Sequence, residues 1–169
     1  MLNGEHVSLA DILTCRERRV AYQQHFLSDY NCPVISFCLN IPGPVKTNPE
    51  LRNVFDAGKN EIIKLLNSLR YVIIDSIEFH EKTGDEMIMC IDGNAPLIKK
   101  KTTLIEEKHP LGRLFDIDVI DTGGNKLSRS TYRRCLICNC QAQECSSTRK
   151  HSVEEMQDAI EIIINQYLT

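Results

Sequence analysis

The chain contains one apolar run that carries two carboxylates, His109-Pro110-Leu111-Gly112-Arg113-Leu114-Phe115-Asp116-Ile117-Asp118-Val119. Residues i and i+2 of a β-strand point to the same face of a sheet, with their α-carbons roughly 6.5–7 Å apart. We therefore predict a strand over Arg113 to Ile120 in which Asp116 and Asp118 share one face. The apolar residues that alternate with them would face the core.

Two neighbouring carboxylates repel each other unless a cation lies between them. Mg²⁺ prefers oxygen ligands and commonly shares them with substrate phosphates. The Asp116-x-Asp118 pair accordingly indicates a magnesium site for phosphate chemistry. The same alternation also suits the solvent-facing side of an amphipathic strand, and the pair alone leaves both interpretations open.

The segments around this strand predict the other elements of an α+β fold. Apolar spacing, caps and turn residues predict helices over Ser8 to Tyr30, Asn48 to about Arg70 and Ala95 to Lys108, and strands over Val34 to Leu39, Tyr71 to Phe79 and Glu86 to Ile91. Thr83-Gly84-Asp85 is the expected hairpin turn, and the capping box Ser152-x-x-Glu155 begins a C-terminal helix. From residue 34 this is the split βαβ, or ferredoxin-like, order of an antiparallel sheet with helices on one face.

A length of 169 residues suits one domain over residues 1–169 with a core of its own. Hydrophobic residues make up 42% of the chain, yet no apolar run approaches the ~18–20 residues that span a bilayer. Met1 to Ala10 lacks the order of a signal peptide, so we expect a soluble, cytoplasmic protein without a membrane partner. The net charge of −3 gives no basic field for nucleic acid, and a polyanionic ligand must be bound locally.

Local positive charge occurs in three segments. The stiff loop from Asn40 to Lys46 follows a predicted strand and could present Lys46 to a phosphate, although a solvated lysine in a turn is the simpler explanation. Arg16 and Arg19 share one side of the first helix and could contact an anion together, or form a solvated face. Ser128 to Arg134 brings three arginines close after the aspartate strand, and the guanidinium suits phosphate oxygens.

Four of the eight cysteines lie close together near the C-terminus, in the pattern Cys135-x2-Cys138-x6-Cys145-x5-His151 with Cys140 as a spare thiol. A tetrahedral Zn²⁺ site accepts these ligand types and the opening spacing. The alternative is a set of packed, reduced thiols next to basic residues that serve substrate or solvent. The spacing after the first pair is irregular, so both interpretations stay open.

These motifs together resemble a known family. The resemblance is to the citrate lyase holo-acyl-carrier-protein synthases, also called apo-citrate lyase phosphoribosyl-dephospho-CoA transferases. It covers nearly the whole chain and lies in residues 16–19, 42–46, 109–119, 128–129 and 133–138, with Cys145 and His151. Cys140 falls outside the family pattern, which favours the other three cysteines and His151 as ligands if a metal is bound.

The resemblance implies a nucleotidyltransferase that uses 2′-(5″-triphosphoribosyl)-3′-dephospho-CoA. Members of the family attach the phosphoribosyl-dephospho-CoA group to a serine of the citrate lyase acyl carrier protein subunit and release diphosphate. The related malonate decarboxylase enzymes perform similar chemistry, so the acceptor carrier stays open. A hypothesis of another class is a zinc-stabilised interaction module that docks lyase subunits without chemistry.

Under this resemblance the candidate residues take roles in the transfer. Asp116 and Asp118 would hold Mg²⁺ against the triphosphate and neutralise charge on the leaving diphosphate. The phosphates would be bound by basic side chains, namely Arg113 beside the catalytic pair, and Arg16, Lys46, Arg129 and Arg134.

The group that accepts the serine proton is not determined by the sequence. Asp118, Asp121, His109 and a metal-bound hydroxide are the alternatives. His109 could also bind substrate, although a histidine at a helix end is more commonly a packing residue.

Overall fold

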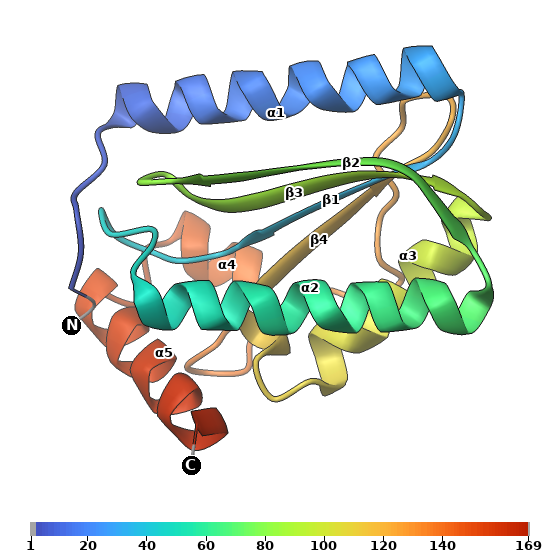
Figure 1. Cartoon of the computed structure of the whole chain (residues 1–169). Coiled ribbons are helices and arrows are strands. Elements are labelled where there is room, and N and C mark those ends of the chain that lie inside the picture. The colour runs from blue at the N-terminus through green and yellow to red at the C-terminus, as the bar shows by residue number, and fades with distance from the viewer. Residues whose placement is uncertain (1–2, 169) are drawn as a thin grey trace.

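The computed structural model describes residues 3–168 and has an α+β fold, in which a four-stranded antiparallel sheet is combined with five α-helices (Figure 1). Residues 1, 2 and 169, at the ends of the expected domain, lie outside the described part. None of the described helices is both long and apolar enough to cross a membrane. In chain order the elements are α1 (Leu9–Tyr30), β1 (Val34–Leu39), α2 (Pro49–Leu69), β2 (Val72–Glu81), β3 (Gly84–Asp92), α3 (Ala95–Lys108), a 3-10 turn η1 (Gly112–Leu114), β4 (Phe115–Ile120), α4 (Ala142–Ser147) and α5 (Val153–Leu168).

The strands lie in the order β2-β3-β1-β4, and each neighbouring pair is antiparallel. From β1 onward the elements follow the predicted order of strand, helix, strand, strand, helix, strand. β4 is therefore an edge strand next to β1, with Asp118 opposite Ser36 and Asp116 opposite Cys38. This register places the predicted aspartate pair at one side of the sheet.

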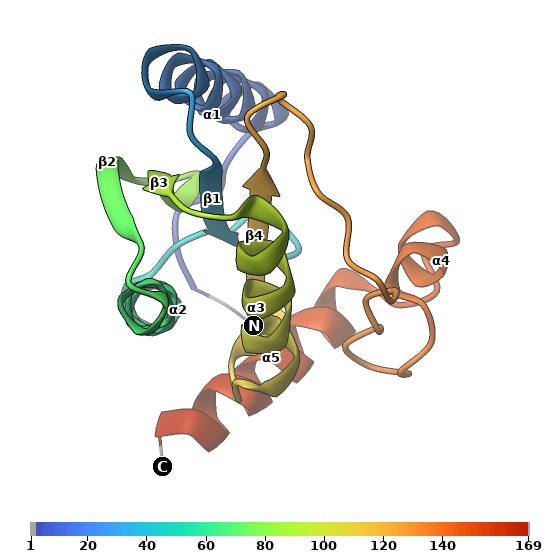
Figure 2. The ribbon, with the colours of Figure 1, turned by 90° about the vertical axis from the view of Figure 1, so that its right-hand side faces the viewer.

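Helices cover both faces of the sheet (Figures 1 and 2). The helices α2, α3 and α5 contribute to the larger core on one face, where Phe37 stacks on Phe55 and meets Phe115 edge-on. On the opposite face, α1 covers a smaller core around Phe26 and Ile88. The expectation of helices on one face, made for the elements from residue 34 onward, holds for α2 and α3. The additional N-terminal helix α1, for which the sequence predicts no face, covers the other face because that face also carries apolar residues.

Capping residues begin the helices where the sequence predicts them. Ser8 and Asp11 form a reciprocal capping box at the start of α1. The Asn48 side chain accepts a backbone N–H at 2.8 Å at the start of α2, where Pro49 occupies the first turn. A capping box also begins the last helix, as its motif predicts.

The strand predicted to begin at Arg113 begins at Phe115 instead. The preceding residues form η1, which packs against the end of α3. A Cβ atom on Gly112 would lie 2.5 Å from the carbonyl oxygen of Ile105, so only glycine fits this close approach. Arg113 is consequently placed at a turn before the strand, rather than on the strand with the aspartates.

Two further segments differ from the prediction. The hairpin turn expected at residues 83–85 is a tighter turn at residues 82–83, because β2 and β3 pair as far as Glu81 and Gly84. The helix α4 was not predicted at all. It spans only six residues and lies among the clustered cysteines, where no helical apolar repeat marks it.

Candidate active site and metal centre

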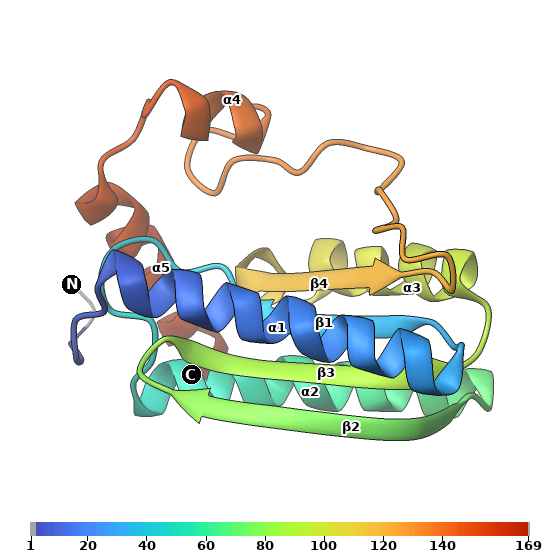
Figure 3. The same cartoon turned by 90° about the horizontal axis from the view of Figure 1, so that it is seen from above.

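Asp116 and Asp118 share the face of β4 that is turned to the same side as α1. Burial alternates along the strand, since Phe115, Ile117 and Val119 are buried while the two aspartates are partly exposed. Figure 3 shows α1 running above β1 and β3 with β4 to one side. The carboxylates therefore remain accessible to a ligand at the uncovered part of this face.

The outer edge of β4 is held by side chains rather than by another strand. Lys99 on α3 donates to the Ile117 carbonyl oxygen at 2.9 Å, and Glu106 accepts the Ile117 N–H at 3.1 Å. Arg133 donates to the Phe115 carbonyl oxygen at 2.5 Å. An edge strand otherwise exposes unpaired backbone groups. These contacts satisfy them and fix the position of the aspartates between them.

Each aspartate has a cationic neighbour. The Lys126 ammonium lies 2.5 Å from the Asp118 carboxylate, and the Arg133 guanidinium lies 3.5 Å from that of Asp116. Both carboxylates border a cleft of about 360 Å³ that also includes Arg129. Acidic and basic side chains therefore surround this cleft together. A phosphate could replace the aspartates as partner of Lys126 and Arg133, and a metal ion could replace these two bases as partner of the aspartates.

Three of the predicted phosphate-binding arginines come together beside the cleft. Arg113, Arg129 and Arg134 border an adjoining cavity of about 550 Å³, and Arg133 lies between the two spaces. Arg129 forms an ion pair with the buried Glu106 carboxylate. Burial, followed by repulsion from Arg133, lowers the pKa of Arg113. Among residues 3–168, neither Arg113 nor Arg134 has a carboxylate within ion-pair distance.

Lys46, in the loop after β1, and Arg16, on α1, are close enough for their charges to interact. The Lys46 ammonium donates to the Ile41 carbonyl oxygen at 2.6 Å, and burial together with the charge of Arg16 lowers its pKa. The Cys38 thiol next to them lies 4.0 Å from an Asp116 carboxylate oxygen, and burial raises its pKa to about 12. The Cys38 thiol is therefore uncharged at neutral pH beside the Asp116 carboxylate.

Arg19, the predicted partner of Arg16, is used within the fold. Its guanidinium pairs with the buried Glu86 carboxylate on β3, which Arg18 also contacts. This charged group holds α1 on the sheet. Arg16 is exposed, whereas Arg19 is tied to the Glu86 carboxylate, so of the two arginines that the helical spacing groups together only Arg19 has an acidic partner within residues 3–168.

The structure does not bring His109 to the aspartates. Its ring packs against Phe115 and Tyr167, on the core side of the sheet, and its Nδ1 accepts the Leu111 N–H at 3.1 Å. Burial lowers its pKa. His109 thus has the environment of the packing histidine that was the alternative to a catalytic one.

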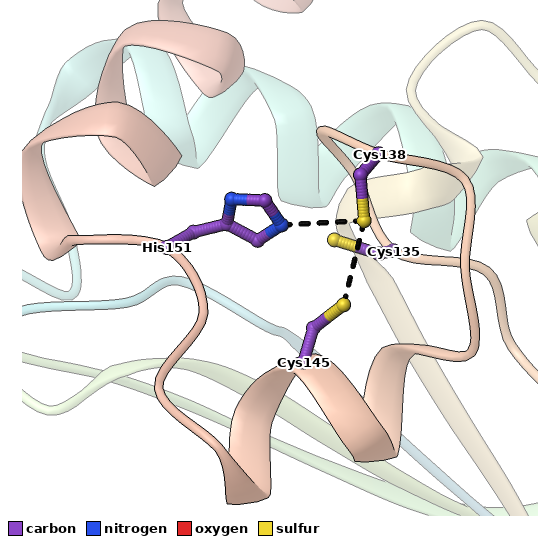
Figure 4. A group of neighbouring side chains, drawn as sticks. All are labelled: Cys135, Cys138, Cys145 and His151. Carbon is purple, nitrogen blue, oxygen red and sulfur yellow. Dashed lines mark hydrogen bonds between the residues drawn. The ribbon is translucent and has the colours of Figure 1, made fainter.

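The clustered cysteines and His151 converge on one point, as Figure 4 shows. The ligand atoms of Cys135, Cys138, Cys145 and His151 all lie within 4.8 Å of one another. Two of the separations are 3.4 Å, between the Cys138 and Cys145 sulfurs, and 3.3 Å, from Cys138 Sγ to His151 Nε2. A tetrahedral ion with bonds of about 2.0–2.3 Å would place its ligands roughly 3.3–3.8 Å apart, so this group can bind a metal.

The backbone around the cluster explains its geometry. Cys135 donates its N–H to the Cys140 carbonyl oxygen at 2.6 Å, and Asn139 between them adopts the left-handed conformation that closes the turn. Backbone donation from Cys140, followed by contact with His151, lowers the pKa of Cys138. Cys140 itself is exposed and lies outside the group. The turn therefore presents Cys135 and Cys138 to the group, α4 adds Cys145, and Cys140 is left outside.

Across residues 3–168, this is the single place where three or more side chains of metal-ligating type meet in one group. Asp116 and Asp118 belong to no such group of three among the described residues. A magnesium ion at Asp116 and Asp118 would have to complete its coordination with oxygen atoms of a ligand or water, which is how Mg²⁺ commonly binds.

Sequence reasoning did not select several residues that the structure places at the site. Arg133 was one of three arginines in its segment, and nothing in the spacing set it apart. Lys99, Glu106 and Lys126 contact β4 or its aspartates from other elements. The one available signal was that Lys99 and Glu106 fall on the apolar face of α3, where a charged side chain must find a partner.

Comparison with known proteins relates the whole chain to one family. A model of the family described as apo-citrate lyase phosphoribosyl-dephospho-CoA transferase matches residues 7–167. The chain belongs to this family. A Vibrio cholerae serotype O1 protein named "Probable apo-citrate lyase phosphoribosyl-dephospho-CoA transferase" is 39% identical over 166 residues, covering 95% of this chain and 93% of the relative.

More distant relatives carry the same description. An "Apo-citrate lyase phosphoribosyl-dephospho-CoA transferase" of Citrobacter koseri is 30% identical over 163 residues, covering 94% of this chain and 89% of the relative. The resemblance identified from the motifs is confirmed. The range that matches the phosphoribosyl-dephospho-CoA transferase family includes the aspartate pair on β4 and the cysteine-histidine group.

Proposed function

We propose that this protein transfers phosphoribosyl-dephospho-CoA from 2′-(5″-triphosphoribosyl)-3′-dephospho-CoA to a serine of the citrate lyase acyl carrier protein subunit, as a nucleotidyltransferase that releases diphosphate. The names of its relatives support the acceptor and the transferred group. The pair of Asp116 and Asp118 on an open face beside several arginines carries the chemistry. The sheet order supports a ferredoxin-like arrangement, and we treat residues 1–169 as one transferase domain.

In the transfer, the serine oxygen of the carrier forms a bond to the α-phosphorus, and the bond from that phosphorus to the oxygen bridging to the β-phosphate breaks. The diphosphate leaves with the electron pair of that bond. Arg113 and Arg134, which lack acidic partners among the described residues, bind the phosphate oxygens. Lys126 and Arg133 neutralise the aspartates before the substrate arrives and can then turn to its phosphates.

Three side chains remain as candidate acceptors of the serine proton, and their surroundings favour one of them. The Asp121 carboxylate accepts the Asn125 N–H at 2.8 Å, which lowers its pKa and weakens it as a base. His109 is packed away from the cleft. Asp118 borders the cleft, and its carboxylate is released when Lys126 turns to the substrate phosphates, so we assign the proton to Asp118.

Asp116 and Asp118 fit a magnesium ion in chemistry, because they are neighbouring carboxylates on one face and the substrate brings further oxygen ligands. When bound there, Mg²⁺ would neutralise charge on the triphosphate. The cysteine-histidine group fits Zn²⁺ better, since it offers thiolates and an imidazole within the reach of one ion. We propose a structural zinc at Cys135, Cys138, Cys145 and His151.

Replacement of the aspartates tests the proposed transfer. The variants Asp116→Asn and Asp118→Asn should each lower diphosphate release by about 100-fold or more, because charge stabilisation at a metal-phosphate site is worth several kcal/mol. The assay combines the triphosphoribosyl precursor, Mg²⁺ and the apo carrier subunit, and Asp92→Asn serves as the control at an exposed strand end. Near-normal rates in both cleft variants would rule out this role.

The acceptor is tested in the same assay with three carrier proteins. Mass analysis should show modification of the citrate lyase carrier and none of the same carrier with its serine changed to alanine. Preferential modification of a malonate decarboxylase carrier would replace the proposed acceptor. If neither carrier is modified although the protein binds lyase subunits tightly through its cysteine-histidine group, the result would favour a non-catalytic interaction module.

Metal content tests the proposed zinc. Reduced, purified protein should contain about one zinc per chain, and Cys138→Ser should lose it because one of four ligands is removed. Cys140→Ser is a matched control, since this exposed thiol lies outside the group. Absence of stoichiometric zinc from the unmodified protein, or equal loss in both variants, contradicts the assignment.

A further inference from the structure

A second cavity, of about 540 Å³, lies between the end of the sheet and the cysteine-histidine group. The loop after β1, η1, the segment from Arg133 to Leu136 and the first turns of α5 form its walls. Its volume falls within the range of sites for small organic ligands, roughly 300–1,000 Å³. The transfer described above uses Arg113, Arg133 and Arg134 among its lining residues and leaves the rest of the cavity without a role.

The charge of this cavity is strongly one-sided. Four arginines border it, namely Arg113, Arg133, Arg134 and Arg149, and no aspartate or glutamate does. Within the described residues, Arg113, Arg134 and Arg149 form no ion pair with a carboxylate. Guanidinium groups that repel one another and lack acidic partners create a site for an anion with more than one charge.

The remaining wall is apolar. Leu114, Leu136, Met156 and Ile160 contribute to it, together with the partly exposed Val153 at the start of α5. An anion alone would leave this surface in contact with water. A ligand that combines a flat, largely apolar ring with a diphosphate would bury it and would pair the arginines at the same time.

The cavity shares lining arginines with the spaces next to the aspartates. Arg113, Arg133 and Arg134 border both this cavity and the neighbouring one, and Arg133 also contacts Asp116. A ligand seated among the apolar residues can therefore extend past the arginines to the carboxylates. In the proposed donor, the triphosphate and the adenosine diphosphate are parts of one molecule and must be bound at connected positions.

We propose that this cavity binds the adenosine 5′-diphosphate part of dephospho-CoA, with the adenine on the apolar wall and the diphosphate on Arg149 and on Arg134, which borders both cavities and therefore also serves the triphosphate. The inference rests on the proposed function, because that function supplies the ligand. The uncharged pantetheine arm is the less suitable occupant, since it would leave the arginines unpaired. Cys135, Cys145 and His151 border the cavity as well as forming the cysteine-histidine group, so a zinc ion held there would support the arginine wall.

Binding of 3′-dephospho-CoA, measured by calorimetry without carrier protein or turnover, tests the proposal. Arg134→Gln and Arg149→Gln should each weaken binding by about 10-fold or more, as expected for loss of a hydrogen bond to a charged group. Arg70→Gln is the matched control at the exposed end of α2. ADP should compete with dephospho-CoA, and pantetheine should not.

A second variant adds a negative charge to the cavity and keeps every arginine. It distinguishes loss of ligand contacts from misfolding of the arginine variants. Val153→Glu places a carboxylate in the cavity wall at the first position of α5, where an acidic residue suits the helix dipole. It should weaken binding of dephospho-CoA by about 10-fold or more through repulsion of the diphosphate, whereas Val153→Gln should change it by less than about threefold.

The outcomes separate this proposal from the proposed function. Unchanged affinity in the arginine variants and in Val153→Glu, absence of dephospho-CoA binding, or competition by pantetheine rather than ADP would overturn the cavity assignment, whatever the turnover. Weakened binding in these variants, with Asp116→Asn binding normally, supports the cavity even if the transfer assay fails. Loss of transfer in Asp116→Asn alone supports the catalytic pair without bearing on the cavity.

Discussion

Arg133 connects the backbone before β4 to the aspartate on it. Its guanidinium donates to the carbonyl oxygens of Arg113 at 2.8 Å and Phe115 at 2.5 Å, and lies 3.5 Å from Asp116. A planar fork with several donors can make these contacts together, whereas a lysine ammonium on a flexible chain cannot reproduce them. Arg133 therefore positions Asp116, and it does so from a segment that follows the strand in sequence.

Replacement of Arg133 should consequently affect the site even when the charge is kept. Arg133→Lys should lower kcat/KM for transfer by about tenfold and the free energy of unfolding by about 1–2 kcal/mol, because hydrogen bonds to backbone acceptors are lost. Arg133→Gln should have a larger effect on kcat/KM. Steady-state kinetics and urea unfolding measure the two quantities, with Arg70→Lys as the control. Full activity of Arg133→Lys would show that charge alone matters here.

At the scale of elements, helix α1 begins at the predicted cap Ser8, which forms a reciprocal capping box with Asp11. The Asp11 carboxylate accepts both the backbone N–H and the hydroxyl of Ser8 at 2.8 Å, and Lys82 lies 3.1 Å away. These contacts, with donation from Ser8 the largest, lower the pKa of Asp11 to about 2. The start of α1 is thus linked to the β2–β3 hairpin through an ionised carboxylate.

This shift predicts how acid affects stability. Because the folded pKa lies below the ordinary value of 3.8, the Asp11 contribution is present above about pH 4 and is lost as the pH falls toward 2. Asp11→Asn should therefore be less stable than the unmodified protein at pH 5–7, and the difference should shrink as the pH falls to 2. Urea unfolding across this range measures it. A difference that stays constant with pH would contradict the assigned ionisation.

Element prediction succeeded where periodic or capping signals were strong and failed where they were absent. The caps at Ser8, Asn48 and Ser152 were each found from local residue types. The helix α4 and the turn η1 carry no such signal, since a six-residue helix and a tight packing turn depend on neighbours that are distant in sequence. Arg113 was placed on a strand for the same reason.

At the scale of the whole molecule, the close packing of α2 on the sheet supports the strand that carries the site. Gly58 on α2 lies directly against Phe37 and Phe115, and a Cβ there would be 2.4 Å from the Phe37 ring and 3.0 Å from that of Phe115. Phe115 is the first residue of β4 and directly precedes Asp116. The distance between helix and sheet is therefore set by glycine at this contact.

Gly58→Ala should destabilise the protein although alanine favours helices. Overpacking costs about 1–3 kcal/mol, against a gain of up to about 1 kcal/mol in helix propensity. We expect a lower free energy of unfolding in urea, with a lowered transfer rate because Phe115 must shift. Asn60→Ala, at an exposed position of the same helix, should be neutral or slightly stabilising. A Gly58→Ala protein as stable as the unmodified one would show that the two rings can move apart.

The sequence alone determined what depends on local pattern. The order of strands and helices, the shared face of Asp116 and Asp118, the helix caps and the metal-ligating residue types follow from side-chain alternation, capping and spacing within short segments. It also identified the family, since the motifs lie within the matched range.

Only the tertiary structure decided which distant residues meet. It placed α1 on the opposite face from α2 and α3, brought Lys99, Glu106 and Arg133 to the edge of β4, and turned His109 into the core. These contacts join elements whose separation along the chain carries no periodic signal. They form because each buried polar or apolar group must find a partner in the packed fold, and that requirement acts through space rather than through sequence spacing.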